Sequence, residues 1–113
     1  MTALALPVLV SALLAALFPS VPHEVVHVEG RGMTSLADLE CRKVTSTLVD
    51  TVCHDAGRRY LLVQVRGAYR QHCGVDAQTV ENLVSAPSVG RFYLREIEGH
   101  RHGCEPAALP ARS

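Results

Sequence analysis

The stretch YLLVQVRGAYRQHCGV, residues 60–75, decides the fold. From Leu61 to Arg66 apolar and polar side chains alternate, which is the period of a strand with one buried face. Gly67 interrupts this alternation, and residues 68–75 have the composition of a further strand. Because the connection between the two strands is short, we expect them to pair antiparallel.

A third strand is expected just before this pair. Residues 44–52 (VTSTLVDTV) are rich in β-branched side chains, which favour strands. The segment His54–Gly57 predicts a turn, because its glycine can adopt a positive φ. The sequence therefore predicts a three-stranded antiparallel β-meander.

Helical periodicity begins after the meander. Asp76 can cap a helix by accepting hydrogen bonds from the free N–H groups of its first turn. Val80, Leu83 and Val84 then form one apolar stripe that can lie on the sheet. Residues 88–99 predict a short C-terminal helical turn. The expected fold class is thus α+β: the meander with one amphipathic helix and a short C-terminal helical turn, held by disulfides.

The N-terminal part has the features of a secretion leader. Residues 3–18 carry no charge and match the apolar region of a signal peptide, whereas a membrane-spanning helix needs about twenty apolar residues. We expect a signal peptide at 1–22, a linker at 23–40, the folded domain at 41–104 and a disordered tail at 105–113. A short apolar run in the linker, Val25, Val26 and Val28, either adds an edge strand or remains a tether. The protein is then exported to the periplasm or the extracellular space. A buried N-terminal helix and an uncleaved anchor are the alternatives.

Four cysteines, an even number in a short chain with a leader, predict a disulfide framework. Cys53 and Cys73 are expected at the same end of the meander, and Cys41 and Cys104 flank the domain. Of the three pairings we therefore favour Cys53–Cys73 with Cys41–Cys104. A domain this small buries only roughly 60% of its unfolded surface, so such cross-links matter for stability.

Charge and motifs argue against catalysis. The chain has 11 basic and 11 acidic residues, so it has no overall preference for a polyanion. Ser46, Asp50 and His54 resemble a catalytic triad, but along one strand they span more than about 20 Å and cannot form a hydrogen-bonded relay. No glycine-rich phosphate loop is present. We expect neither an enzyme nor a cofactor.

Neighbouring cysteines and histidines raise the alternative of a zinc site. They occur at Cys53–His54, at His72–Cys73 and in the segment His100–Cys104. Such soft and borderline ligands suit zinc. No C-x₂-C or H-x₃-H spacing is joined to a cysteine pair, so oxidised cysteines are the expectation and no metal ligand is assigned.

Three stretches of the chain resemble the KTSC family, a short domain named for its occurrence at the C-terminus of some lysyl-tRNA synthetases and also found alone in bacterial proteins. Residues 46–55 are similar to the opening strand of the family, and residues 61–75 to its next two strands. Residues 86–93 (APSVGRFY) are similar to its most distinctive segment: a small residue, x, Ser, x, Gly, Arg and two aromatics. The likeness covers about residues 44–101 and implies a bacterial protein.

The chain departs from the family pattern in the third strand, where the family usually has a Tyr-x-Tyr pair. Arg70 and His72 occupy those places. Tyr69 comes one residue earlier, on the other face of the strand, because strand side chains alternate. The family is conjectured to bind RNA, and the resemblance carries that conjecture over as an alternative function.

The favoured function is a non-catalytic, exported binding or accessory module whose partner is a protein or a small ligand. Its contact surface is expected on the sheet face that the helix leaves open. Nucleic-acid binding is the first alternative, which export, zero net charge and the few aromatic residues disfavour. A zinc module is the second. The candidate ligand contacts are Tyr69, Arg70, His72, Arg91 and Tyr93.

Overall fold

A computed structural model describes residues 24–99 and 102–104. The predicted signal peptide and C-terminal tail lie outside these residues. No helix in the described part is long and apolar enough to cross a membrane. The elements, in chain order, are β1 (Val25–Glu29), β2 (Gly32–Ser35), β3 (Glu40–Lys43), β4 (Val49–Asp55), β5 (Tyr60–Val65), β6 (Ala68–Cys73), α2 (Ala77–Val84), α3 (Val89–Phe92) and the π-helical segment η2 (Tyr93–Glu98).

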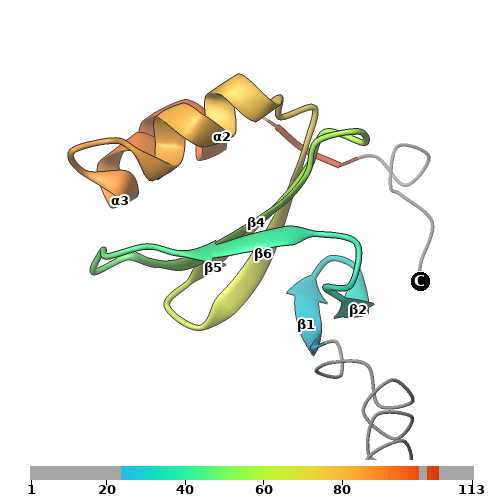
Figure 1. Ribbon diagram of the computed structural model, residues 1–113. Helices are drawn as coiled ribbons and strands as arrows, with labels where there is room; N and C mark the ends of the chain where they lie inside the picture. The colour runs from blue at the N-terminus through green and yellow to red at the C-terminus, as the bar shows by residue number, and fades with distance from the viewer. Residues whose placement is uncertain (1–23, 100–101, 105–113) are drawn as a thin grey trace, which may run out of the picture.

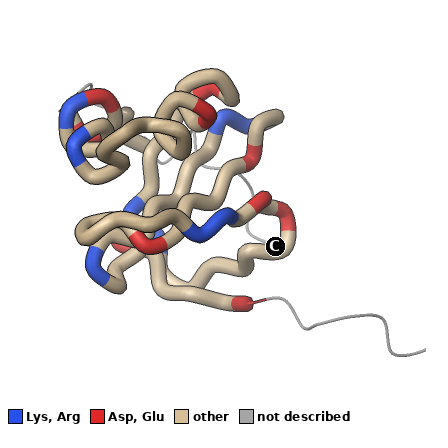
Figure 2. The backbone as a smooth tube through the Cα atoms, turned by 60° about the vertical axis from the view of Figure 1, so that its left-hand side comes forward, with Lys and Arg blue, Asp and Glu red and all other residues tan. Residues whose placement is uncertain are grey.

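The six strands form one sheet in the order β2-β1-β6-β5-β4-β3 (Figure 1). Neighbouring strands are antiparallel except β1 and β6, which run parallel. The sheet curls into a half-barrel, with α2 and α3 on one side of β4–β6 and β1 and β2 on the other (Figure 1). Basic and acidic residues are interspersed along the backbone (Figure 2).

The expectation of a three-stranded meander is therefore wrong for the whole sheet. β4, β5 and β6 do form an antiparallel meander, but β3 extends it at one edge and β1 with β2 at the other. β3 has the sequence ECRK and is exposed at every position, so it has no apolar alternation to reveal it. The parallel pairing of Val28 with Tyr69 joins residues far apart in the chain, which no local pattern specifies.

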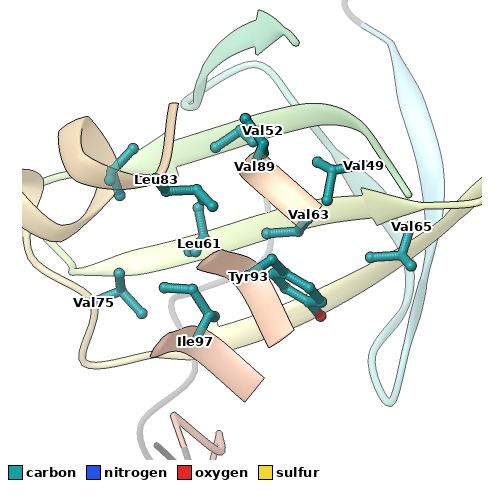
Figure 3. Packing of buried hydrophobic residues seen from close by; sticks show 11 residues of the cluster. Val49, Val52, Leu61, Val63, Val65, Val75, Leu83, Val89, Tyr93 and Ile97 are labelled. Carbon is teal, nitrogen blue, oxygen red and sulfur yellow. The ribbon is translucent and has the colours of Figure 1, made fainter. Parts of the chain in front are cut away.

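The first core lies between the meander and the helices (Figure 3). Leu61, Val63 and Val65 point from β5 towards the helices, as their alternation predicts. Leu83 of α2 and Tyr93 of η2 pack against them, and both are fully buried. The expected helices are thus present, with Asp76 accepting a hydrogen bond from the backbone N–H of Thr79 at the start of α2.

A second core covers the opposite face of the same strands. Tyr60 and Leu62 of β5 and Tyr69 of β6 pack there against Val26 and Val28 of β1. The face that was expected to be open is consequently buried over much of its area. β1 completes the core that the meander leaves unfinished.

Both disulfides differ from the expected pairing. The bonds are Cys41–Cys53 and Cys73–Cys104. Cys41 lies directly opposite Cys53 in the β3–β4 ladder, whereas β5 separates Cys53 from β6. Two strand spacings amount to roughly 10 Å, which a disulfide cannot span. The expected pairing failed because β3 was not recognised as a neighbour of β4.

A close backbone approach joins the loop before β4 to α3. An added Cβ on Gly90 would lie 3.1 Å from Leu48 Cβ and 3.4 Å from Ser46 Oγ. Glycine is therefore the residue that lets residues 46–48 and α3 touch.

Replacing Gly90 with alanine should lower the free energy of unfolding by about 1 kcal/mol, because overpacking at this contact exceeds the gain in helix propensity. Urea denaturation of Gly90→Ala measures this. Gly57→Ala is the matched control, since its nearest non-neighbouring atom would be 3.6 Å away and a change within about 0.5 kcal/mol is expected. Equal stability of both variants with the parent would contradict the packing argument.

Candidate functional site

An open groove of about 510 Å³ lies between the loop before β4 and the start of α3. Residues 45–48 and residues 87–91 line it, together with Arg66 and Leu94. Both segments belong to the stretches on which the family resemblance rests. The most distinctive parts of the sequence therefore meet in one groove.

Two serines shape the walls of this groove. Ser46 Oγ accepts hydrogen bonds from the backbone N–H groups of Leu48 and Val49, each at 3.2 Å. Ser88 Oγ accepts one from the N–H of Arg91 at 3.3 Å and begins α3. Because each hydroxyl acts as an acceptor here, its own hydrogen can still be donated. The two serines are thus structural residues that can also contact a ligand.

Arg66 reaches the groove from the turn between β5 and β6. It adopts a positive φ of 50°, which is uncommon for a residue with a side chain. Its backbone N–H donates to the carbonyl of Leu48 at 3.0 Å, so the turn is held against the wall of the groove. Arg66 was not among the candidate contacts, although the Arg66–Gly67 turn was the signal that could have suggested it.

Arg66 and Arg91 differ from the other described arginines, each of which contacts a carboxylate or, in the case of Arg31, the Tyr60 ring. Within residues 24–99 neither of the two side chains forms an ion pair or a hydrogen bond. Among the rest, Arg31 stacks over the Tyr60 ring at 5.2 Å. The other arginines form ion pairs: Arg42 with Glu81, Arg58 with Asp55, Arg59 with Asp76, Arg70 with Glu29 and Glu98, and Arg95 with Glu96.

No aspartate or glutamate lines the groove. The chain has zero net charge, and its described basic and acidic residues are interspersed along the backbone (Figure 2). Two arginines without an acidic residue in the lining are therefore a local excess of positive charge. Arginine presents a planar fork of N–H donors that suits carboxylate and phosphate. The groove can therefore hold an anionic group.

The other candidate contacts are distributed over both faces of the sheet. Tyr93 and His72 are buried beneath the helices, and Tyr69 is buried in the second core. Arg70 bridges Glu29 and Glu98 at 3.4 Å and 2.8 Å. Of the five candidates, only Arg91 lines the groove.

His72 and Tyr93 form a buried pair at the place where the sequence departs from the family pattern. His72 Nε2 and the Tyr93 hydroxyl are hydrogen-bonded at 2.9 Å, and the rings meet edge to face. Burial lowers the pKa of His72 to about 4. Burial, and then the nearby Glu98, raise the pKa of Tyr93 to about 12. Both side chains are therefore uncharged at neutral pH and act as part of the core.

The candidate triad residues have separate structural partners. Asp50 accepts a hydrogen bond from the N–H of Gly67 at 3.1 Å, and His54 Nε2 donates to the carbonyl of Val75 at 2.8 Å. The alternative of a zinc site requires free thiolates, but all four cysteines form disulfides. Across the described residues no group of three or more His, Cys, Asp or Glu side chains could hold a metal ion.

Comparison with known proteins agrees with the resemblance. The sequence profile of the KTSC domain matches residues 45–100. A solved crystal structure of a KTSC domain protein from Yersinia pestis is 31% identical to this chain, with a TM-score of 0.51, and the match covers 54% of this chain and 87% of the other. No curated protein sequence matches the chain.

The chain belongs to the KTSC domain family. The family has no known catalytic role. Its profile begins at residue 45, so β1, β2 and β3 all precede the matched region. The two disulfides join this preceding part and the C-terminal end to the shared domain, and disulfides are typical of non-cytoplasmic proteins.

The buried histidine predicts a pH dependence of stability. Since the pKa of His72 is about 4 in the folded protein and roughly 6.5 in the unfolded chain, the unfolded chain binds more protons between these values. His72 therefore makes its full contribution to the free energy of unfolding above pH 6.5. This contribution declines by about 2 to 3 kcal/mol as the pH falls towards 4. Urea denaturation from pH 7 to 4 measures this loss.

His72→Gln provides the comparison, because glutamine keeps a hydrogen-bonding group near Tyr93 but does not titrate. Its free energy of unfolding should fall less steeply over the same range. An identical slope in the parent and the variant would refute this assignment.

Proposed function

We propose that this protein is a non-catalytic, exported binding module that holds an anionic group of its ligand between Arg66 and Arg91. One observation carries the proposal: these two arginines lack a carboxylate partner within residues 24–99, and both line the same acid-free groove. A guanidinium that forms no ion pair in the free protein can bind an incoming anion without first breaking one.

The hydroxyl groups of the groove suit the same ligand. Thr45, Ser46, Thr47 and Ser88 all line it, and hydroxyl hydrogens can be donated to carboxylate or phosphate oxygens. The lining contains no aromatic side chain, so it offers no platform for stacking nucleotide bases. A small anionic ligand or an acidic group of a protein partner is therefore favoured over nucleic acid.

Export is supported by two independent features. The uncharged segment at residues 3–18 has the composition of a signal peptide, and the four described cysteines form two disulfides, as in proteins from oxidising compartments. An intact mass of the protein recovered outside the cytoplasm should lack the leader. A full-length mass found only in the cytoplasm would contradict export.

The anion site can be tested with inorganic phosphate as the probe. Titrating the ¹⁵N-labelled, oxidised protein at low salt should shift the amide signals of residues 45–48 and 88–91 in a saturable way. In the double variant Arg66→Gln/Arg91→Gln the dissociation constant should rise at least roughly tenfold, because each charge-assisted contact contributes about 1 kcal/mol or more.

Arg58→Gln is the matched control, because Arg58 is also an exposed arginine but lies at the other end of β5 and already pairs with Asp55. It should bind phosphate as the parent does. Equal affinity of the parent and the double variant, or no saturable shift in the groove, would refute the anion site.

A further inference from the structure

A second cavity, of about 490 Å³, lies on the face of the sheet opposite the helices. Its floor is formed by Thr51, Gln64 and Tyr69 of the shared meander. Leu36 and Leu39, which precede the region matched by the family profile, form apolar parts of its lining. The N-terminal addition of this chain therefore turns one sheet face into a walled cavity, which is separate from the anion groove.

A row of four polar side chains crosses this cavity. Lys43 is opposite Thr51, Thr51 is opposite Gln64, and Gln64 is opposite Tyr69 in the register of four adjacent strands. All four line the cavity. The amide of Gln64 is half-buried and, in the described part of the chain, has no hydrogen-bond partner, so both its donor and its acceptor can serve a ligand.

The two ends of this row carry opposite charges. Lys43 lies at the β3 end and forms no ion pair among residues 24–99. Glu24, directly before β1, also lines the cavity and likewise has no ion pair within those residues. Glu24 lies near Tyr69, and the pKa of the Tyr69 hydroxyl is raised. Burial is the larger cause of this rise, and the negative charge of Glu24 is the next.

We infer that this cavity binds a short peptide with free termini, three or four residues long, laid across the strands. Its carboxylate would meet Lys43, its ammonium group Glu24, and its peptide groups the amide of Gln64. Three strand spacings from Lys43 to Tyr69 amount to roughly 14 Å, and an extended chain covers about 3.5 Å per residue. Apolar walls with a few convergent polar groups are typical of such sites.

The inference is independent of the anion groove, so the same protein can test both. The probe is trialanine, compared with its N-acetylated and C-amidated form, which carries no terminal charge. Titrated into the ¹⁵N-labelled, oxidised protein, trialanine should shift the amide signals of Thr51, Gln64 and Tyr69 in a saturable way. The capped form should bind at least roughly fivefold more weakly, as expected for the loss of exposed ion pairs.

Lys43→Gln separates charge recognition from general binding. It should weaken the binding of trialanine roughly three- to fivefold and leave the affinity for trialanine amide, which has no carboxylate, unchanged. Arg58→Gln, outside the cavity, should behave as the parent towards both probes. The proposal would be overturned by equal affinity for trialanine and its capped form. It would also be overturned if no amide signal of the cavity shifted in a saturable way up to about 10 mM peptide, a concentration that would detect even a binding free energy of a few kcal/mol.

Discussion

Strand β5 is covered on both faces, and this double burial is the constraint on which the rest of the structure depends. Leu61 and Val63 are fully buried on the side of the helices, and Leu62 is fully buried on the other side. A sheet of three strands with one helical layer can bury only Leu61 and Val63, and it leaves Leu62 exposed to solvent. At roughly 25 cal/mol for each Å² of buried apolar area, leaving Leu62 and its neighbours exposed would cost a small domain much of its marginal stability.

The segment before the shared domain supplies the missing layer. β1 places Val26 and Val28 against Leu62 and Tyr69, and the Cys41–Cys53 bond fixes β3 to the opposite edge. The two faces then differ in use. The helix side carries the family's distinctive segments and the groove lined by Arg66 and Arg91. The other side carries the cavity that the N-terminal segment completes.

The sequence identified the parts of the fold that local patterns encode. Alternation in β5, the β-branched run of β4 and the Asp76 cap predicted α2 and the antiparallel strands β4–β6, although these are half of a six-stranded sheet and not the whole of it. Residues 86–93 identified the family. β3 was missed because it has no buried side chain. The apolar run of β1 allowed an edge strand, but its parallel pairing with a distant strand could not be predicted. The error in the disulfides followed directly from the missing β3.

The sites were less predictable than the fold. Arg91 was named because it belongs to the distinctive segment, but Tyr93 and His72 proved to be core residues that hydrogen-bond each other. Whether an arginine pairs with a carboxylate depends on contacts between separate elements, as between Arg70 and Glu98. Sequence periodicity contains no information on such contacts. Only the folded chain could show that Arg66 and Arg91 form no ion pair with another described residue.

The most direct test of this account is a disulfide map of the natively folded protein, digested without reductant and analysed by mass spectrometry. If residues 24–43 complete the sheet as described, the linked peptides will contain Cys41 with Cys53 and Cys73 with Cys104. Peptides that link Cys53 with Cys73 and Cys41 with Cys104 would contradict it. In that case β3 would not pair with β4 as described, and the wall of the cavity that Cys41 and Lys43 form would not exist.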